Sequence, residues 1–165
     1  MELRPERSGD QGAIHALIQA AFETAEHADG NEGQIVDALR EQGALAVSLV
    51  AEQEGELIGH VALSVVHIEG GRSGEWFGLG PIAVAPRRQR EGVGSALMRA
   101  ALDALRARGA SGCVLLGDPA YYARFGFEPA APLVLEGVPP AYFQALSFSG
   151  ERPAGRVRYH QAFGA

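Results

Sequence analysis

The sequence predicts one α/β domain, in which helices flank a mixed, mostly antiparallel central sheet. Two segments with helical periodicity come first, alternating strand-like segments follow, and a strand, helix and strand unit comes after them. The chain has 165 residues and 47% apolar content, which suits a single domain spanning residues 1–165.

Two amphipathic helices are expected near the N-terminus. Ser8 and the glutamine three residues after it have the spacing of a capping box, and the apolar residues that follow predict a helix over residues 9–22. Asn31 begins a second pattern of this kind, which Gly43 is suited to end. A polar linker over residues 23–30 separates the two helices.

The apolar period then changes from helical to alternating. Alternation over residues 45–51, a turn at 53–56 and a Val- and Ile-rich run over 57–68 predict an antiparallel hairpin. A glycine-rich turn at 69–74 leads to another strand over 75–84. Three consecutive strands therefore form a meander.

A crossover unit follows the meander. Residues 92–108 carry an apolar helical stripe, and residues 113–116 form a short apolar strand that should lie parallel to the strand before the helix. A ligand crevice is expected at the carboxyl ends of these two strands. The remaining predictions are a short helix ended by Gly126, a strand starting at Leu133, a short helix over 140–146 and a strand over 155–160.

A basic turn with paired glycines lies between the third strand and the crossover helix. Gly92 and Gly94 permit a tight turn and leave the N–H groups of the first helical turn open to an anion. Leu97 stands where a Rossmann fingerprint needs a small residue, and no Lys-Ser/Thr pair follows Gly94 as a Walker loop requires. Spacing alone is equally compatible with an ordinary solvated turn.

Two segments of this chain resemble signatures of the GNAT superfamily of N-acetyltransferases. Residues 89–94, Gln-Arg-Glu-Gly-Val-Gly, resemble its Gln/Arg-x-x-Gly-x-Gly/Ala loop, and residues 122–127, Tyr-Ala-Arg-Phe-Gly-Phe, are similar to its Tyr-x-Lys/Arg-x-Gly-Phe segment. Both occur in the family's order within residues 75–128. The resemblance implies the GNAT fold with a splayed strand pair and acetyl-coenzyme A as co-substrate. Pro81 suits a bulge in such a strand, although an ordinary strand end explains it equally well.

The resemblance assigns coenzyme contacts by position. The main-chain groups that would line the pantetheine and thioester belong to Ile82, Ala83 and Val84. The loop that would hold the pyrophosphate comprises Gln89, Arg90, Glu91, Gly92, Val93, Gly94 and Ser95. Arg87 and Arg88 would lie near the phosphates, although solvated arginines explain them equally well.

Tyr122 matches the tyrosine that protonates the departing thiolate in many members of the family. On a helix, Tyr121 would pair with Phe125 in the core and Tyr122 would point elsewhere, toward a ligand. The alternative is a tyrosine whose hydroxyl only closes the pocket, because a thiol leaves fairly well without full protonation.

The sequence departs from the family pattern in two places. Gly117 follows the short strand where many members carry asparagine, so that coenzyme contact is not carried over. Gly78 stands where some members carry a catalytic glutamate, which leaves the general base unassigned. Glu75 is the first candidate, and a water chain is an alternative. Three weaker candidates are Glu32, His60 and His67.

Composition limits the other functional classes. The net charge of −6 argues against nucleic acid as the main partner. Cys113 is the only cysteine, which excludes an intrachain disulfide and two-cysteine metal motifs, and its apolar strand suggests a buried structural thiol. Neither a signal peptide nor a membrane span is evident, so a cytoplasmic location is expected.

The sequence thus predicts a metal-free N-acetyltransferase that moves an acetyl group from acetyl-coenzyme A to a primary amine, with a small molecule as the expected acceptor. Two alternatives stay open: a peptide or protein N-acetyltransferase, and a regulatory module that binds acetyl-coenzyme A without turnover. A homodimer is compatible with both. The sequence does not identify the acceptor.

Overall fold

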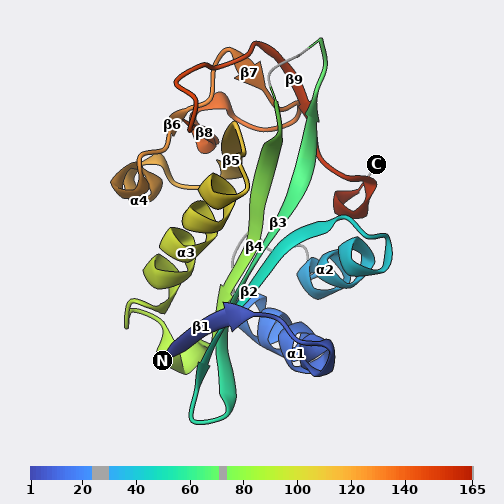
Figure 1. Cartoon of the computed structure of the whole chain (residues 1–165), viewed down its shortest axis with the longest axis vertical. Coiled ribbons are helices and arrows are strands. Elements are labelled where there is room, and N and C mark those ends of the chain that lie inside the picture. Colours follow the sequence, from blue (N-terminus) through green and yellow to red (C-terminus); the bar gives the residue numbers. More distant parts are fainter. Residues whose placement is uncertain (24–29, 71–73, 165) are drawn as a thin grey trace.

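The computed structural model describes residues 1–23, 30–70 and 74–164. Most of the predicted linker (24–29) and the middle of the glycine-rich turn (71–73) lie outside the described residues. Figure 1 shows a long twisted sheet with helix α3 (Val93–Ala107) on one face and helices α1 (Gln11–Phe22) and α2 (Glu32–Glu41) on the other. This is the predicted layer arrangement.

The sheet is mixed and mostly antiparallel, as predicted. Its main path runs β1-β2-β3-β4-β5-β8-β6, and β9 pairs with both β3 and β7. The strands of the described residues are β1 (Glu2–Pro5), β2 (Leu45–Gln53), β3 (Glu56–Ile68), β4 (Trp76–Val84), β5 (Gly112–Leu116), β6 (Glu128–Pro129), β7 (Leu133–Val134), β8 (Phe143–Ser147) and β9 (Gly155–Arg158). The short strands β1 and β6 were not predicted, because neither segment is long enough to show alternation.

Strand β4 is bulged, and its pairing with β5 ends before the bulge. Leu63 and Val61 of β3 lie opposite Leu79 and Ile82 of β4, so the bulge contains Gly80 and Pro81. Toward β5, the parallel pairing extends only from Trp76–Gly112 to Gly78–Val114. Beyond these residues the two strands separate, which confirms the splayed pair and opens a wedge at their carboxyl ends.

Two local predictions are wrong. The segment 140–146 is helical only as a 3₁₀ turn at Pro140–Tyr142, after which β8 pairs antiparallel with β5. The free edge of β5 supplies main-chain hydrogen bonds that outweigh the local helical pattern. At the first helix, Ser8 does not cap α1: Ser8–Asp10 form a 3₁₀ turn, in which the Asp10 carboxylate accepts the Arg7 N–H at 2.6 Å, and α1 begins at Gln11.

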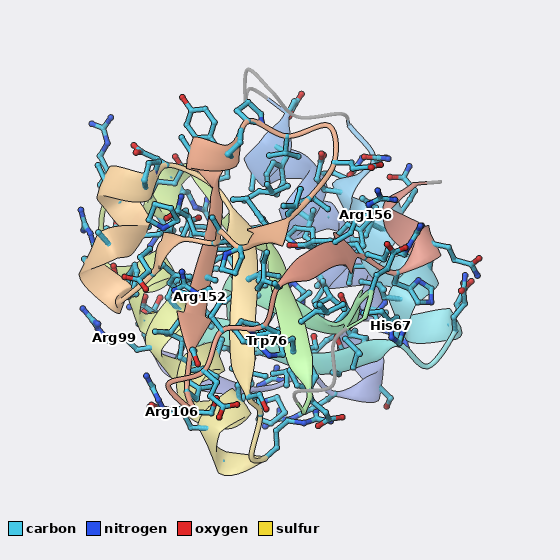
Figure 2. The ribbon with its side chains drawn as sticks, turned by 90° about the horizontal axis from the view of Figure 1, so that it is seen from above. His67, Trp76, Arg99, Arg106, Arg152 and Arg156 are labelled. Atoms are coloured by element: carbon cyan, nitrogen blue, oxygen red, sulfur yellow. The ribbon has the colours of Figure 1, made fainter. Side chains whose placement is uncertain are left out.

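The core lies on both faces of the sheet. On one face, the α3 residues Leu97, Met98 and Leu105 are fully buried against β3 and β4. Burial of each such side chain stabilises the folded state by about 1.5–3 kcal/mol. Ile14 and Ile18 of α1 and Val36 of α2 pack on the opposite face of the sheet. Seen from above, Trp76 lies in the middle of the molecule, while Arg99 and Arg106 of α3 lie at its rim (Figure 2).

Candidate active site

The loop between β4 and α3 presents unused main-chain donors. Gly92 has φ +88° and ends the loop directly before α3, a conformation that glycine adopts without steric cost. The first bond of the helix runs from the Ala96 N–H to the Gly92 carbonyl. The N–H groups of Val93, Gly94 and Ser95 therefore precede the ladder and point to the space in front of the helix, where an anion is favoured.

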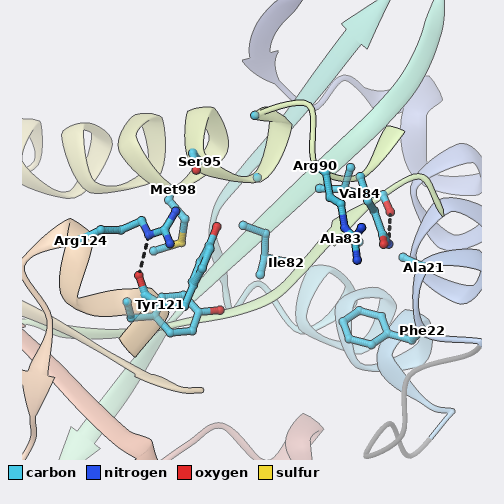
Figure 3. A pocket seen from close by; sticks show the side chains of 14 residues that line it. Ala21, Phe22, Ile82, Ala83, Val84, Arg90, Ser95, Met98, Tyr121 and Arg124 are labelled. Atoms are coloured by element: carbon cyan, nitrogen blue, oxygen red, sulfur yellow. Dashed lines mark hydrogen bonds between the residues drawn. The ribbon is translucent and has the colours of Figure 1, made fainter. Parts of the chain in front are cut away.

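A cavity of about 590 Å³ opens in front of this loop (Figure 3). The predicted coenzyme residues that line it are Ile82, Ala83, Val84, Gln89, Arg90, Gly92, Gly94 and Ser95. The strand bulge and the glycine loop thus face one space, and Tyr122 lies in its wall.

Four predicted coenzyme residues do not line this cavity. Arg87 is exposed and pairs with Glu56. Arg88 pairs with Glu91 at 3.0 Å and also donates to a glutamine of β2. The Val93 side chain is buried in the core, where only its main-chain N–H is available to a ligand.

Some lining residues were not predicted. Ala21 and Phe22 come from the end of α1, and Met98 comes from the second turn of α3. Arg124 also lines the cavity; its guanidinium lies 4.4 Å from the centre of the Tyr121 ring, and its Nε donates to the Tyr121 carbonyl at 3.1 Å (Figure 3). Arg124 is part of the 122–127 segment that resembles the family signature, so the sequence could have indicated it as a site residue.

Tyr121 and Tyr122 differ less in burial and orientation than their positions on a helix predicted. The Tyr121 ring lies 5.7 Å from that of Phe125, as predicted, but Tyr121 is only partly buried and also lines the cavity. Tyr122 contacts both Phe125 and Phe127. Burial raises the pKa of Tyr122, with the neighbouring Tyr121 and Asp118 acting in the same direction. Its hydroxyl therefore stays protonated at neutral pH and can donate.

A second cavity, of about 770 Å³, meets the first at the sheet wedge. Three residues line both cavities: Phe22, Ile82 and Tyr122. The second cavity's other lining residues come from the start of α2, the bulge of β4, the end of β5, the segment after β7, and β9 with the residues that follow it. Two molecules, one in each cavity, would therefore meet beside Ile82 and Tyr122.

At two positions of this region, a neighbouring tyrosine ring leaves room only for glycine. A methyl group on Gly117 would lie 2.2 Å from Cε2 of Tyr122, so the ring in this position leaves no room for a side chain at residue 117. A methyl group on Gly78 would lie 2.7 Å from Cε2 of Tyr159. The ring of Tyr159, from the segment after β9, thus occupies the space that a side chain at Gly78 would need.

The structure separates the four candidate bases. Glu75 is exposed at the start of β4, the end remote from the bulge, and lines neither cavity. His67 is exposed and lines a different hollow. His60 is fully buried, and desolvation lowers its pKa to about 4. Glu32 alone among the four lines the second cavity.

The described residues contain neither a metal-binding cluster nor a membrane-spanning helix. Across 1–23, 30–70 and 74–164, there is no group of three or more histidine, cysteine, aspartate or glutamate side chains that could hold a metal ion. Within the same part of the chain, no helix has the length and apolar character needed to cross a membrane.

Comparison with known proteins agrees with this geometry. Residues 2–130 match the family model described as acetyltransferase (GNAT) domain. The uncharacterized N-acetyltransferase YhbS of Escherichia coli strain K12 is 40% identical over 132 residues, which cover 79% of this chain and 75% of that protein.

Two crystal structures are similar over nearly the whole chain. A GNAT family acetyltransferase from Brucella melitensis, in complex with acetyl-CoA, has 48% identity and a TM-score of 0.87, with 98% of this chain and 97% of that one covered. The Escherichia coli YhbS structure, in complex with CoA, has 35% identity and a TM-score of 0.88, with 99% and 92% covered.

Proposed function

Because the chain belongs to the GNAT acetyltransferase family, we propose that it transfers an acetyl group from acetyl-coenzyme A to the primary amine of a small molecule. In this proposal residues 1–165 act as one catalytic domain. The first cavity takes the coenzyme and the second takes the amine. The observation that carries the proposal is that both cavities are lined by Ile82 and Tyr122, where the two reactants would meet.

The first cavity suits the coenzyme in three respects. The N–H groups of Val93, Gly94 and Ser95 would hold the pyrophosphate, because a helix N-terminus favours negative charge. Arg90 and Arg124 add positive charge to the same cavity wall. The bulge leaves main-chain groups near Ile82 outside regular pairing with β5, where they are available to the pantetheine arm.

Direct transfer needs few protein groups. The neutral amine attacks the thioester carbonyl carbon, and a main-chain N–H between Ile82 and Val84 polarises the carbonyl oxygen. The C–S bond breaks as the C–N bond forms, and the sulfur takes a proton from the Tyr122 hydroxyl. The amine releases its surplus proton to water, and Tyr122 regains its proton from solvent. The products are an acetamide and the free thiol of coenzyme A.

Two other functions make different predictions. A peptide acceptor would have to extend beyond the second cavity, and a binding module would hold acetyl-coenzyme A without releasing thiol. The purified chain should therefore be mixed with acetyl-coenzyme A and, separately, with small amines, polyamines, amino acids, aminoglycosides and peptides. Thiol release that depends on a small amine supports the proposal. Tight coenzyme binding with no release across the panel contradicts it and favours the binding module.

A further inference from the structure

Tyr159 lies between the second cavity and a third one. The third cavity, of about 630 Å³, is lined by residues around the start of β2, near the end of β3, just after α3 and from Arg158 to Gln161. Among the described residues, only Arg158 and Tyr159 line both cavities. The Arg158 side chain is 61% exposed and pairs with Glu69, so the ring of Tyr159 forms the wall between the two spaces.

The Tyr159 ring rests directly on the sheet. A methyl group on Gly78 would lie 2.7 Å from Cε2 and 3.2 Å from Cζ of the ring, so the ring and the main chain are in contact. Gly78 belongs to the last parallel pair with β5, before the two strands separate. Along β4 it comes four residues before Ile82, a separation of roughly 10–13 Å in a strand. The ring therefore borders the second cavity at a distance from the place where the two reactants would meet.

The C-terminal segment holds the ring in place. Phe163 contacts the Tyr159 ring edge to face, with 5.2 Å between the ring centres. Phe163 ends the 3₁₀ turn Gln161–Phe163, whose cap is His160. The Gln161 side chain donates to that of Gln42, directly after α2, at 3.1 Å, and the turn lies beside α2 (Figure 1). Contacts with the sheet, with Phe163 and through α2 thus fix one position of the ring.

The Tyr159 side chain acts on the second cavity through its volume. Burial raises the pKa of its hydroxyl, so the side chain is uncharged near neutral pH. Replacing a packed ring by a methyl group leaves a space that the surroundings fill only in part. At Tyr159, that space would join the second cavity to the third.

We propose that Tyr159 limits the length of the amine acceptor by closing the end of the second cavity that is remote from Ile82. The proposal rests on the proposed function and adds a specificity-determining residue to it. An acceptor that places its nitrogen beside Ile82 and Tyr122 extends toward the Tyr159 ring. A longer acceptor meets the ring before its nitrogen reaches the thioester, and steric conflict of this kind is how a pocket rejects a larger homologue.

The test compares two amines of the same chemistry and different length. The full chain, saturated with coenzyme A, is titrated calorimetrically with 2-phenylethylamine and with its longer homologue 6-phenylhexylamine. Their aromatic bodies suit the apolar side chains that line the cavity, among them Phe22, Leu79 and Leu116. We expect the wild-type chain to bind the shorter amine more tightly. Tyr159→Ala should raise the relative affinity for the longer amine by about 10-fold or more, which is a discrimination that steric contacts in a pocket supply.

The matched control is Leu135→Ala. Leu135 lines the second cavity but not the third. Its truncation therefore enlarges the cavity without joining the two spaces, and it should change the affinity ratio by less than about 2-fold. The emission of Trp76, the only tryptophan of the chain, reports whether each variant is folded, because Trp76 packs in the same apolar cluster as Tyr159.

Further variants separate the ring from other effects of the substitution. Tyr159→Phe keeps the ring and should keep the wild-type preference. Ala46 lines the third cavity but not the second, so Ala46→Leu added to Tyr159→Ala refills the third cavity and should restore the preference for the shorter amine. If Tyr159→Ala does not fold, Tyr159→Leu, which retains an apolar side chain, replaces it with the same expected direction.

The inference is overturned if neither amine binds, or if Tyr159→Ala and Leu135→Ala give the same affinity ratio. It is also overturned, with the proposed function intact, if a small amine releases thiol and Tyr159→Ala leaves the preference among amines of different length unchanged. A length preference that depends on Tyr159, without thiol release from any amine, would instead contradict the proposed function and leave the wall between the cavities in place.

Discussion

The ring of Tyr122 packs against Gly117 so closely that a methyl group added there would lie 2.2 Å from Cε2 of the tyrosine. Gly117 follows β5, and its N–H donates to the Tyr142 carbonyl at 2.9 Å, so the main chain at this point is held by the β8 side of the sheet. Asp118 then caps α4 (Pro119–Tyr122) by accepting the Ala120 N–H at 2.9 Å. The position of Tyr122 between the two cavities is therefore set by the glycine and the cap together.

Gly117→Ala should lower kcat by about 10-fold or more, because the added methyl group displaces Tyr122 and small misplacements of catalytic groups are costly. Steady-state thiol release and coenzyme titration test this, with coenzyme affinity expected to change little. Gly12→Ala is the control, because nothing lies within 4 Å of a methyl group there. Equal turnover in both variants would show that Tyr122 does not need this position.

Tyr122→Phe removes only the hydroxyl. If that hydroxyl protonates the leaving sulfur, kcat should fall by roughly 10-fold while the Kd for coenzyme A stays within 2-fold. The effect is at the low end for a general acid, because a thiol of pKa near 8.5 is a fair leaving group. Tyr142→Phe, at a tyrosine that is 50% exposed and lines neither cavity, is the matched control. Unchanged kcat for Tyr122→Phe would leave the tyrosine only a role in closing the pocket.

Gly94→Val should abolish measurable coenzyme binding while the chain still folds. A β-carbon at Gly94 would lie 3.7 Å from Val84 Cγ2 and 3.9 Å from Tyr121 Oη, which is ordinary contact for the free protein. The branched side chain would nevertheless fill space in front of the helix N–H groups. Calorimetry with coenzyme A tests the affinity, and Gly94→Ala should give an intermediate loss. Normal affinity in the valine variant would contradict the assignment of the pyrophosphate to this loop.

His60 should make the fold sensitive to mild acid. Its Nε2 lies 2.8 Å from Ser48 Oγ, which donates to Glu6, so Nε2 carries the proton. Among the residues that the structure describes, the buried Nδ1 has no hydrogen-bond partner. Desolvation lowers its pKa to about 4, from an ordinary value of 6.5.

Between pH 6.5 and about 4 the unfolded chain binds a proton at this histidine that the folded chain does not, so stability falls as the pH is lowered through that window. From pH 7 to pH 5 the loss should be about 2 kcal/mol. Urea unfolding at the two pH values measures it. His60→Gln should remove most of that pH dependence, whereas an unchanged dependence would assign it to other groups.

The sequence by itself predicted most of the element order, a strand interrupted at Pro81 and a glycine turn before α3 that is suited to an anion. These features depend on local chemistry: the period of the apolar residues, the proline at position 81 that cannot join a ladder, and the glycines that open a helix N-terminus. The segments around Gly92 and Tyr122 also resemble the family's signatures, and that resemblance depends on no long-range contact.

Only the tertiary structure decided what depends on distant partners. The segment after Tyr142 became a strand because the edge of β5 was free, although its local pattern favoured a helix. Glu75 was nearest in sequence to the expected base position, yet it lies just before β4, at the end remote from the bulge, while Glu32 is brought to the second cavity from α2. Long-range pairing and packing select such positions, and one sequence without its partners does not display them.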